Sequence, residues 1–129
     1  MKFKLVSGDS NELVKQFFYV AWQACGGTLG YGFLQNNPNA DADAVFNNVK
    51  SAGDYPGDYT PYREGKYYAD YVFGRMLKVG INVLEDNVIS ISDYTPTPDY
   101  EAWCRAFPTH EALLEAAAVA ANCELERIE

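Results

Sequence analysis

The stretch from Asp9 to Gly27 constrains the fold most, because it carries both the boundaries and the periodicity of one amphipathic helix. Asp9 followed by Glu12 resembles a capping box with aspartate as the cap, and Gly26-Gly27 provides a stop. Between these signals, apolar residues recur at spacings of three and four: Leu13, Phe17, Val20, Ala21 and Ala24. This pattern predicts a helix over about residues 10–25.

Two further elements flank this helix. Residues 2–6 read Lys, Phe, Lys, Leu, Val, and this alternation is typical of a half-buried strand, which we expect at the edge of a sheet. Asn39 can cap a helix over about residues 40–52, with two aspartates in its first turn. Gly53 then ends it.

A third helix is predicted over about residues 66–79. Its apolar face would consist of Ala69, Val72, Phe73, Met76 and Leu77. Gly80 would close it, and Gly74 inside it costs on the order of 1 kcal/mol relative to alanine, which suggests a close crossing of another element.

The following residues have the pattern of a β-hairpin. Two short apolar runs, 81–84 and 88–92, are separated by Glu85-Asp86-Asn87, and Asn87 can take the left-handed conformation that such a turn needs. Ile89 and Ile91 would then define the core face of the hairpin.

The C-terminal part is predicted to be mainly helical. Asp99 can cap a short helix that contains Tyr100, Trp103 and Phe107, and Thr109 can cap a last helix from His110 to about Asn122. Residues 123–129 form a strand or fray. Together these elements predict an α+β fold: one domain, residues 1–129, with a small antiparallel sheet (the hairpin plus an edge strand) packed against four to five helices.

The charge is divided unevenly along the chain. Residues 79–129 contain ten acidic and two basic residues, whereas residues 1–78 balance at eight each, so the net charge of −8 belongs to the C-terminal part. Such an average surface repels phosphate backbones and anionic lipids. We therefore expect neither membrane association nor direct nucleic-acid binding.

The cysteines and the apolar runs bear on localisation. Cys25, Cys104 and Cys123 leave one cysteine unpaired under any intramolecular scheme, which suits a reducing compartment. The first residues are too polar for a signal peptide, and no apolar run reaches the roughly 18–20 residues that span a bilayer. These features predict a cytoplasmic protein.

The sequence lacks a recognisable catalytic set. His110 is the one histidine, and neither Cys25 nor Cys104 lies where a helix N-terminus would promote a thiolate. We therefore expect no metal site, no cofactor and no catalytic residues. A hydrolase that uses paired carboxylates and a metal remains a minor alternative, with Asp41 and Asp43 or Glu85 and Asp86 as examples of such pairs.

Two residue sets are candidates for binding. The first combines carboxylates with aromatic residues in the acidic part, which suits a protein partner with a basic face and could also imitate nucleic acid. It consists of Asp93, Tyr94, Asp99, Tyr100, Glu101, Trp103, Glu111 and Glu115. The second set combines cations with tyrosines, which could hold a small anionic, nucleotide-like ligand. It consists of Tyr59, Tyr62, Arg63, Lys66, Arg75 and Lys78.

Two stretches, residues 68–78 (YADYVFGRMLK) and 99–113 (DYEAWCRAFPTHEAL), resemble small uncharacterised proteins of bacteriophages and prophages. The resemblance transfers no functional residues. It implies a setting in which short accessory proteins bind and inhibit host machinery or sequester a signalling molecule. Combined with the charge and the surplus of tyrosine, it favours a non-enzymatic binding protein that engages a host protein.

Overall fold

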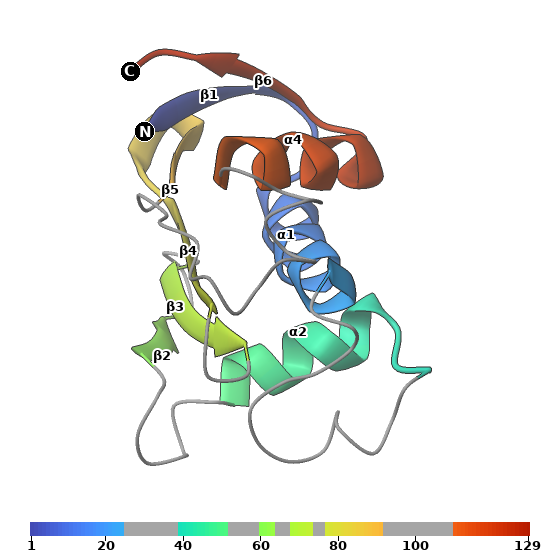
Figure 1. Ribbon diagram of the computed structural model, residues 1–129. Helices are drawn as coiled ribbons and strands as arrows, with labels where there is room; N and C mark the ends of the chain where they lie inside the picture. The colour runs from blue at the N-terminus through green and yellow to red at the C-terminus, as the bar shows by residue number, and fades with distance from the viewer. Residues whose placement is uncertain (25–38, 52–59, 64–67, 74–76, 92–109) are drawn as a thin grey trace.

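The computed structural model describes residues 1–24, 39–51, 60–63, 68–73, 77–91 and 110–129 (Figure 1). In chain order its elements are β1 (Lys2–Ser7), α1 (Ser10–Ala24), α2 (Ala42–Ser51), β2 (Thr60–Arg63), β3 (Tyr68–Phe73), β4 (Leu77–Val83), the 3-10 turn η3 (Glu85–Asn87), β5 (Val88–Ile91), α4 (His110–Ala121) and β6 (Glu124–Arg127). The α+β class predicted from the sequence is confirmed. The predicted short helix that begins near Asp99 lies outside the described residues.

The strands form one sheet in the order β2-β3-β4-β5-β1-β6, and every neighbouring pair is antiparallel. Its six strands make it larger than the predicted hairpin plus edge strand. β1 lies between β5 and β6, so its predicted place at the edge is wrong. An alternating strand buries one face whether it is central or peripheral, and only the neighbours decide which.

The largest correction concerns the predicted helix over residues 66–79. In its place β3 and β4 pair from Ala69 opposite Ile81 to Phe73 opposite Leu77, and Gly80 lies within β4 opposite Asp70. The segment is rich in tyrosine, valine and phenylalanine, residues that favour strands. Its apolar spacing also fits a period of two. The pairing of this segment with β4, which in turn pairs with β5, determines that it forms a strand and not a helix.

The predicted hairpin is confirmed between β4 and β5, which pair with Val83 opposite Ile89. Asp86 and Asn87 have φ of 59° and 58°, and the Val88 N–H donates to the Glu85 carbonyl oxygen. Two consecutive left-handed residues give the primed turn whose twist matches that of the flanking strands. Asn87 therefore takes the conformation expected from the sequence.

One face of the sheet is covered by the helices, which lie together on its concave side (Figure 1). The predicted core residues Ile89 and Ile91 are buried there with Phe3 and Leu5 of β1 and Ile81 of β4. The helices contribute a second set of buried side chains to the same cluster: Leu13, Val14, Phe17, Phe18, Ala21, Val45, Leu113, Leu114, Ala117 and Ala118. Within the described part of the chain, no helix combines the length and apolarity needed to cross a bilayer.

The starts of α1 and α2 show how local signals set helix ends. The Asn11 N–H donates to Asp9 Oδ1 at 2.8 Å, so Asp9 caps α1 as predicted. At α2 the Ala44 N–H donates to Asp41 Oδ1 at 2.9 Å. Asp41, not Asn39, is thus the cap, and α2 begins two residues later than expected. Asparagine and aspartate are both favoured as N-cap residues, so the sequence alone does not show which of the two caps the helix.

α4 confirms the predicted last helix and ends in a compact turn. The Cys123 N–H donates to the Ala118 carbonyl oxygen at 2.8 Å and the Asn122 N–H donates to that of Val119 at 3.2 Å, while Asn122 has a φ of 56°. These two bonds define a Schellman motif with asparagine in the left-handed position. The turn sends the chain back along β1 as β6, so the strand alternative for the tail is the correct one.

Candidate functional site

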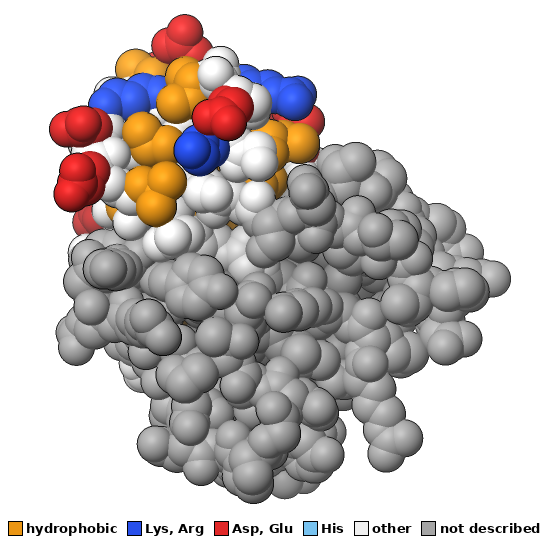
Figure 2. Space-filling model, turned by 90° about the vertical axis from the view of Figure 1, so that its left-hand side faces the viewer, with side chains coloured by type: hydrophobic (Ala, Val, Ile, Leu, Met, Phe, Trp, Pro, Cys, Tyr) orange, Lys and Arg blue, Asp and Glu red, His pale blue; other side chains and the backbone are white. Residues whose placement is uncertain are grey.

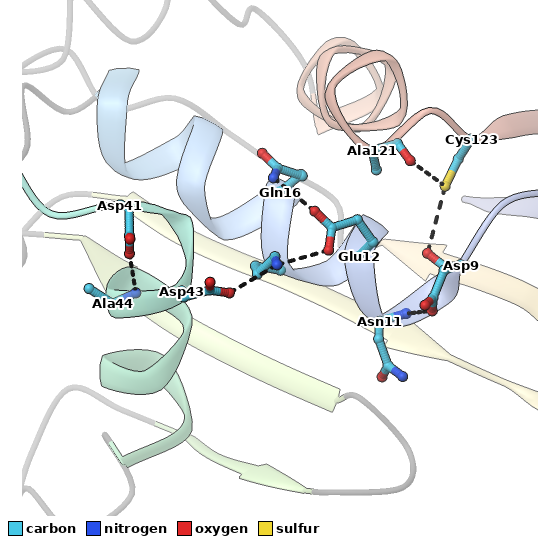
Figure 3. Close-up of polar contacts among 10 residues, drawn as sticks. Asp9, Asn11, Glu12, Gln16, Asp41, Asp43, Ala44, Ala121 and Cys123 are labelled. Atoms are coloured by element: carbon cyan, nitrogen blue, oxygen red, sulfur yellow. Dashed lines mark hydrogen bonds and ion pairs between the residues drawn. The ribbon is translucent and has the colours of Figure 1, made fainter.

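A polar cluster lies where α1 meets α2 (Figure 3). Lys15 Nζ is 2.8 Å from Glu12 Oε2 and 2.9 Å from Asp43 Oδ1, so one ammonium group joins carboxylates of the two helices. Gln16 Nε2 donates to the other oxygen of Glu12 at 3.1 Å. Asp43, which the sequence places in the first turn of a helix, is therefore an interhelical ion-pair residue.

The electrostatics of this cluster oppose a catalytic role. Hydrogen bonds from Lys15 and then Gln16 lower the pKa of Glu12, and hydrogen bonds to Glu12 and then Asp43 raise the pKa of Lys15. Both groups therefore stay charged around neutral pH, whereas a general acid or base needs a pKa near the working pH. The cluster stabilises the packing of α2 on α1.

We expect Lys15→Met to lower the free energy of unfolding by about 0.5–1 kcal/mol at neutral pH, as for exposed ion pairs. The lowered pKa of Glu12 means that its contribution is complete above the ordinary carboxyl pKa of 4.5 and disappears as the pH falls through the lowered value. The raised pKa of Lys15 means that its contribution persists up to about the ordinary value of 10.5. Urea unfolding from pH 2 to 9 should show the difference between wild type and variant shrinking only in acid. A difference that is independent of pH would contradict the ion pair.

Cys123 is half-buried beside the start of α1. Its thiol lies 3.7 Å from the Asp9 carbonyl oxygen and 3.6 Å from that of Ala121. Burial is the main cause of its raised pKa, which disfavours the thiolate needed for nucleophilic attack. Within the described ranges, no three His, Cys, Asp or Glu residues gather closely enough to hold a metal ion.

Only two members of the predicted acidic and aromatic surface fall in the described part of the chain, and both lie on α4. Glu111 is partly buried, and its Oε2 is 3.5 Å from Arg127 Nη1 of β6. Glu115, one turn further, is exposed. The other six predicted residues, Asp93, Tyr94, Asp99, Tyr100, Glu101 and Trp103, lie outside the described residues.

Sequence reasoning overlooked two carboxylates on β6. Glu124 and Glu126 are exposed, while Leu125 between them packs against the core. The signal was present in the alternation of Glu124-Leu125-Glu126, which is typical of a half-buried strand. Because the alternation covers only a few residues, the sequence did not show whether the segment forms a strand or frays.

The two lysines of β1 contact other groups, although one of them, Lys4, lies opposite Glu126 in the pairing with β6. Lys2 Nζ is 3.5 Å from Glu129 Oε2, and Lys4 Nζ donates to the Asp86 carbonyl oxygen. Across the described residues, Glu115, Glu124 and Glu126 form no ion pair, and we call these three the C-terminal carboxylates. Figure 2 shows the face that lies on the left-hand side of Figure 1. On its described part, acidic, basic and hydrophobic side chains interleave.

The second candidate set, of cations and tyrosines, was expected to lie partly on a helix over residues 66–79, but residues 68–73 and 77–83 are strands. Arg63 lies in β2 opposite Tyr68, and Lys78 lies in β4 opposite Val72. These register positions are four residues apart along β3, which corresponds to about 13 Å. Tyr62 lies in β2, and Tyr59, Lys66 and Arg75 lie outside the described residues.

No protein-family model, curated protein or solved structure matches this chain.

Proposed function

We propose that this chain is a non-enzymatic binding protein whose predicted acidic and aromatic surface, together with the C-terminal carboxylates, engages a protein partner with a basic surface. The observation that carries the proposal is the exposure of the C-terminal carboxylates without ion pairs among the described residues. Exposed charges of one sign attract a complementary surface and orient it during association.

We further propose that this chain is an accessory protein of the bacteriophage type. The resemblance of residues 68–78 and 99–113 to small bacteriophage proteins supports an accessory factor that engages or inhibits a host protein. The predicted surface residues outside the described ranges, such as Tyr100 and Trp103, would add aromatic contacts to the carboxylates. Aromatic residues commonly supply most of the energy at such interfaces.

The test is affinity capture from a bacterial lysate with wild type and with Glu115→Lys, Glu124→Lys and Glu126→Lys variants. Each reversal should weaken capture of the specific partner by up to about thirtyfold, because an exposed charge pair contributes about 0.2–1 kcal/mol and the substitution turns attraction into repulsion. Binding should also weaken between 50 and 300 mM salt. Quantitative mass spectrometry of the bound proteins measures both effects.

The matched control is Glu85→Lys, which changes the net charge equally at an exposed residue of the β4–β5 turn. It should leave capture unchanged. If no protein is retained, or if the three reversals and the control behave alike, the acidic surface is not the binding site.

A further inference from the structure

The sheet has one described edge at which outward backbone groups lie beside exposed carboxylates, those of Glu124 and Glu126 on β6. Among the described strands, β6 is the last in the sheet order and pairs only with β1 (Figure 1). Its residues Glu124, Glu126 and Arg127 are exposed. An exposed edge strand can accept a further strand through its outward backbone groups.

The pairing register identifies which backbone groups face that edge. The Ile128 N–H donates to the Lys2 carbonyl oxygen at 3.0 Å, and Glu126 lies opposite Lys4. In an antiparallel pair the residues alternate between those bonded to the neighbour and those directed away from it. Glu126 shares the phase of Ile128, so the N–H and C=O groups of Leu125 and Arg127 face the outer edge.

A second copy of this chain is a poor occupant of the edge. A continuous antiparallel sheet requires that facing residues lie on the same face, so the two registers in which β6 overlaps most with its own copy place Leu125 opposite Leu125 or Glu126 opposite Glu126. The first register sets Glu124 against Glu126 twice, and the second sets Glu126 against its own copy. Like charges directly opposite one another destabilise a sheet.

The same geometry selects a different occupant. Glu124 and Glu126 lie on one face of β6, and Leu125 lies on the other face against the core. An incoming strand with basic residues opposite both glutamates would form two favourable cross-strand pairs. The residue between them would lie beside Leu125, where an apolar side chain fits best.

We propose that the outer edge of β6 receives an extended segment of a partner protein with basic residues at alternating positions and an apolar residue between them. This inference rests on the proposed function and adds the mode of recognition: the segment extends the sheet by one strand. Main-chain bonds to Leu125 and Arg127 supply affinity, and Glu124 and Glu126 supply selectivity.

The first test uses a labelled peptide, acetyl-Lys-Val-Lys-Val-Lys-amide, with the full-length protein. Nuclear magnetic resonance titration should show slower amide hydrogen exchange at Leu125 and Arg127 when the peptide binds. A peptide of the same composition in the order Lys-Lys-Val-Val-Lys should bind at least fivefold more weakly, because no two of its lysines are two residues apart and it cannot place lysines opposite both glutamates. Equal binding of both peptides, or no added protection at these two amides, overturns the proposal.

The second test compares Arg127→Pro with Arg127→Ala. Both remove the contact with Glu111, but only proline removes the outward N–H, and an edge strand tolerates proline where its N–H faces solvent. Arg127→Pro should bind the peptide about tenfold more weakly than Arg127→Ala, as expected for one lost hydrogen bond. Equal affinities overturn edge pairing.

The two proposals fail in different ways. If Glu124→Lys and Glu126→Lys abolish peptide binding while Arg127→Pro matches Arg127→Ala and the amides gain no protection, the acidic surface binds without extending the sheet, and only the present inference is overturned. If neither the charge reversals nor the proline affect binding, both proposals are overturned.

Discussion

Phe17→Ala should lower the free energy of unfolding by about 3–5 kcal/mol, the usual cost of removing a buried phenylalanine. Phe17 is fully buried, and its ring meets that of Phe18 edge-on with the centroids 5.5 Å apart. The substitution therefore leaves a cavity and removes an aromatic contact that contributes about 0.5–1.5 kcal/mol beyond area burial. Because a domain of this size is stable by about 5–15 kcal/mol, the loss is a large fraction of the total.

Urea unfolding followed by circular dichroism measures this effect. The matched control is Val119→Ala on α4, whose side chain is 83% exposed, and we expect a change within about 0.5 kcal/mol. A loss below about 1 kcal/mol for Phe17→Ala would mean that Phe17 is not buried in the core as the structure shows.

Gly8→Ala should be the most damaging small substitution, since it acts on the backbone and on packing together. Gly8 has a φ of 105°, a region in which a residue with a Cβ costs about 1–3 kcal/mol. A Cβ there would lie 2.5 Å from Cys123 Sγ and 2.9 Å from Cys123 Cα. Relief of this overlap would cost about 1–3 kcal/mol more. The β1–α1 turn and the α4–β6 turn touch at this point, so both would have to move.

A double-mutant cycle with Cys123→Ala separates the two causes. Removing Sγ should recover part of the loss, because the sulfur contact disappears, while the positive φ and the contact with Cα remain. Ser7→Ala, one residue earlier and exposed, serves as the neutral control. If Gly8→Ala costs the same in both backgrounds, the packing of Cys123 on Gly8 does not contribute.

Local sequence signals were sufficient to predict several helices and strands. The cap at Asp9, the three- and four-residue spacing through Phe17 and the left-handed Asn87 each act over a few neighbouring residues, so a sequence expresses them directly. The predictions of α1, the β4–β5 hairpin and α4 rested on such signals and are confirmed. The boundary of α2 was displaced because two residues close together, Asn39 and Asp41, can both cap a helix.

Non-local pairing explains the errors. Tyr68–Phe73 has apolar residues that fit a period of 3.6 and a period of two, and only the ladder with β4 shows that it is a strand. The prediction of the candidate sites was limited for the same reason, because it also depends on contacts between residues far apart in the sequence. A count of charges identified the acidic part, but the count could not show that Glu111 meets Arg127 or that Asp43 meets Lys15.

The sequence by itself determined the α+β class, the helix from Ser10 to Ala24, the turn at Asn87 and the acidity of the C-terminal part, because these depend on composition or on residues close in the chain. Within the described residues, the tertiary structure alone decided that β1 is central, that β6 forms an edge, and which carboxylates have no ion pair. A strand is completed by neighbours that lie far away in the sequence, here residues 88–91 and 124–127 on the two sides of β1.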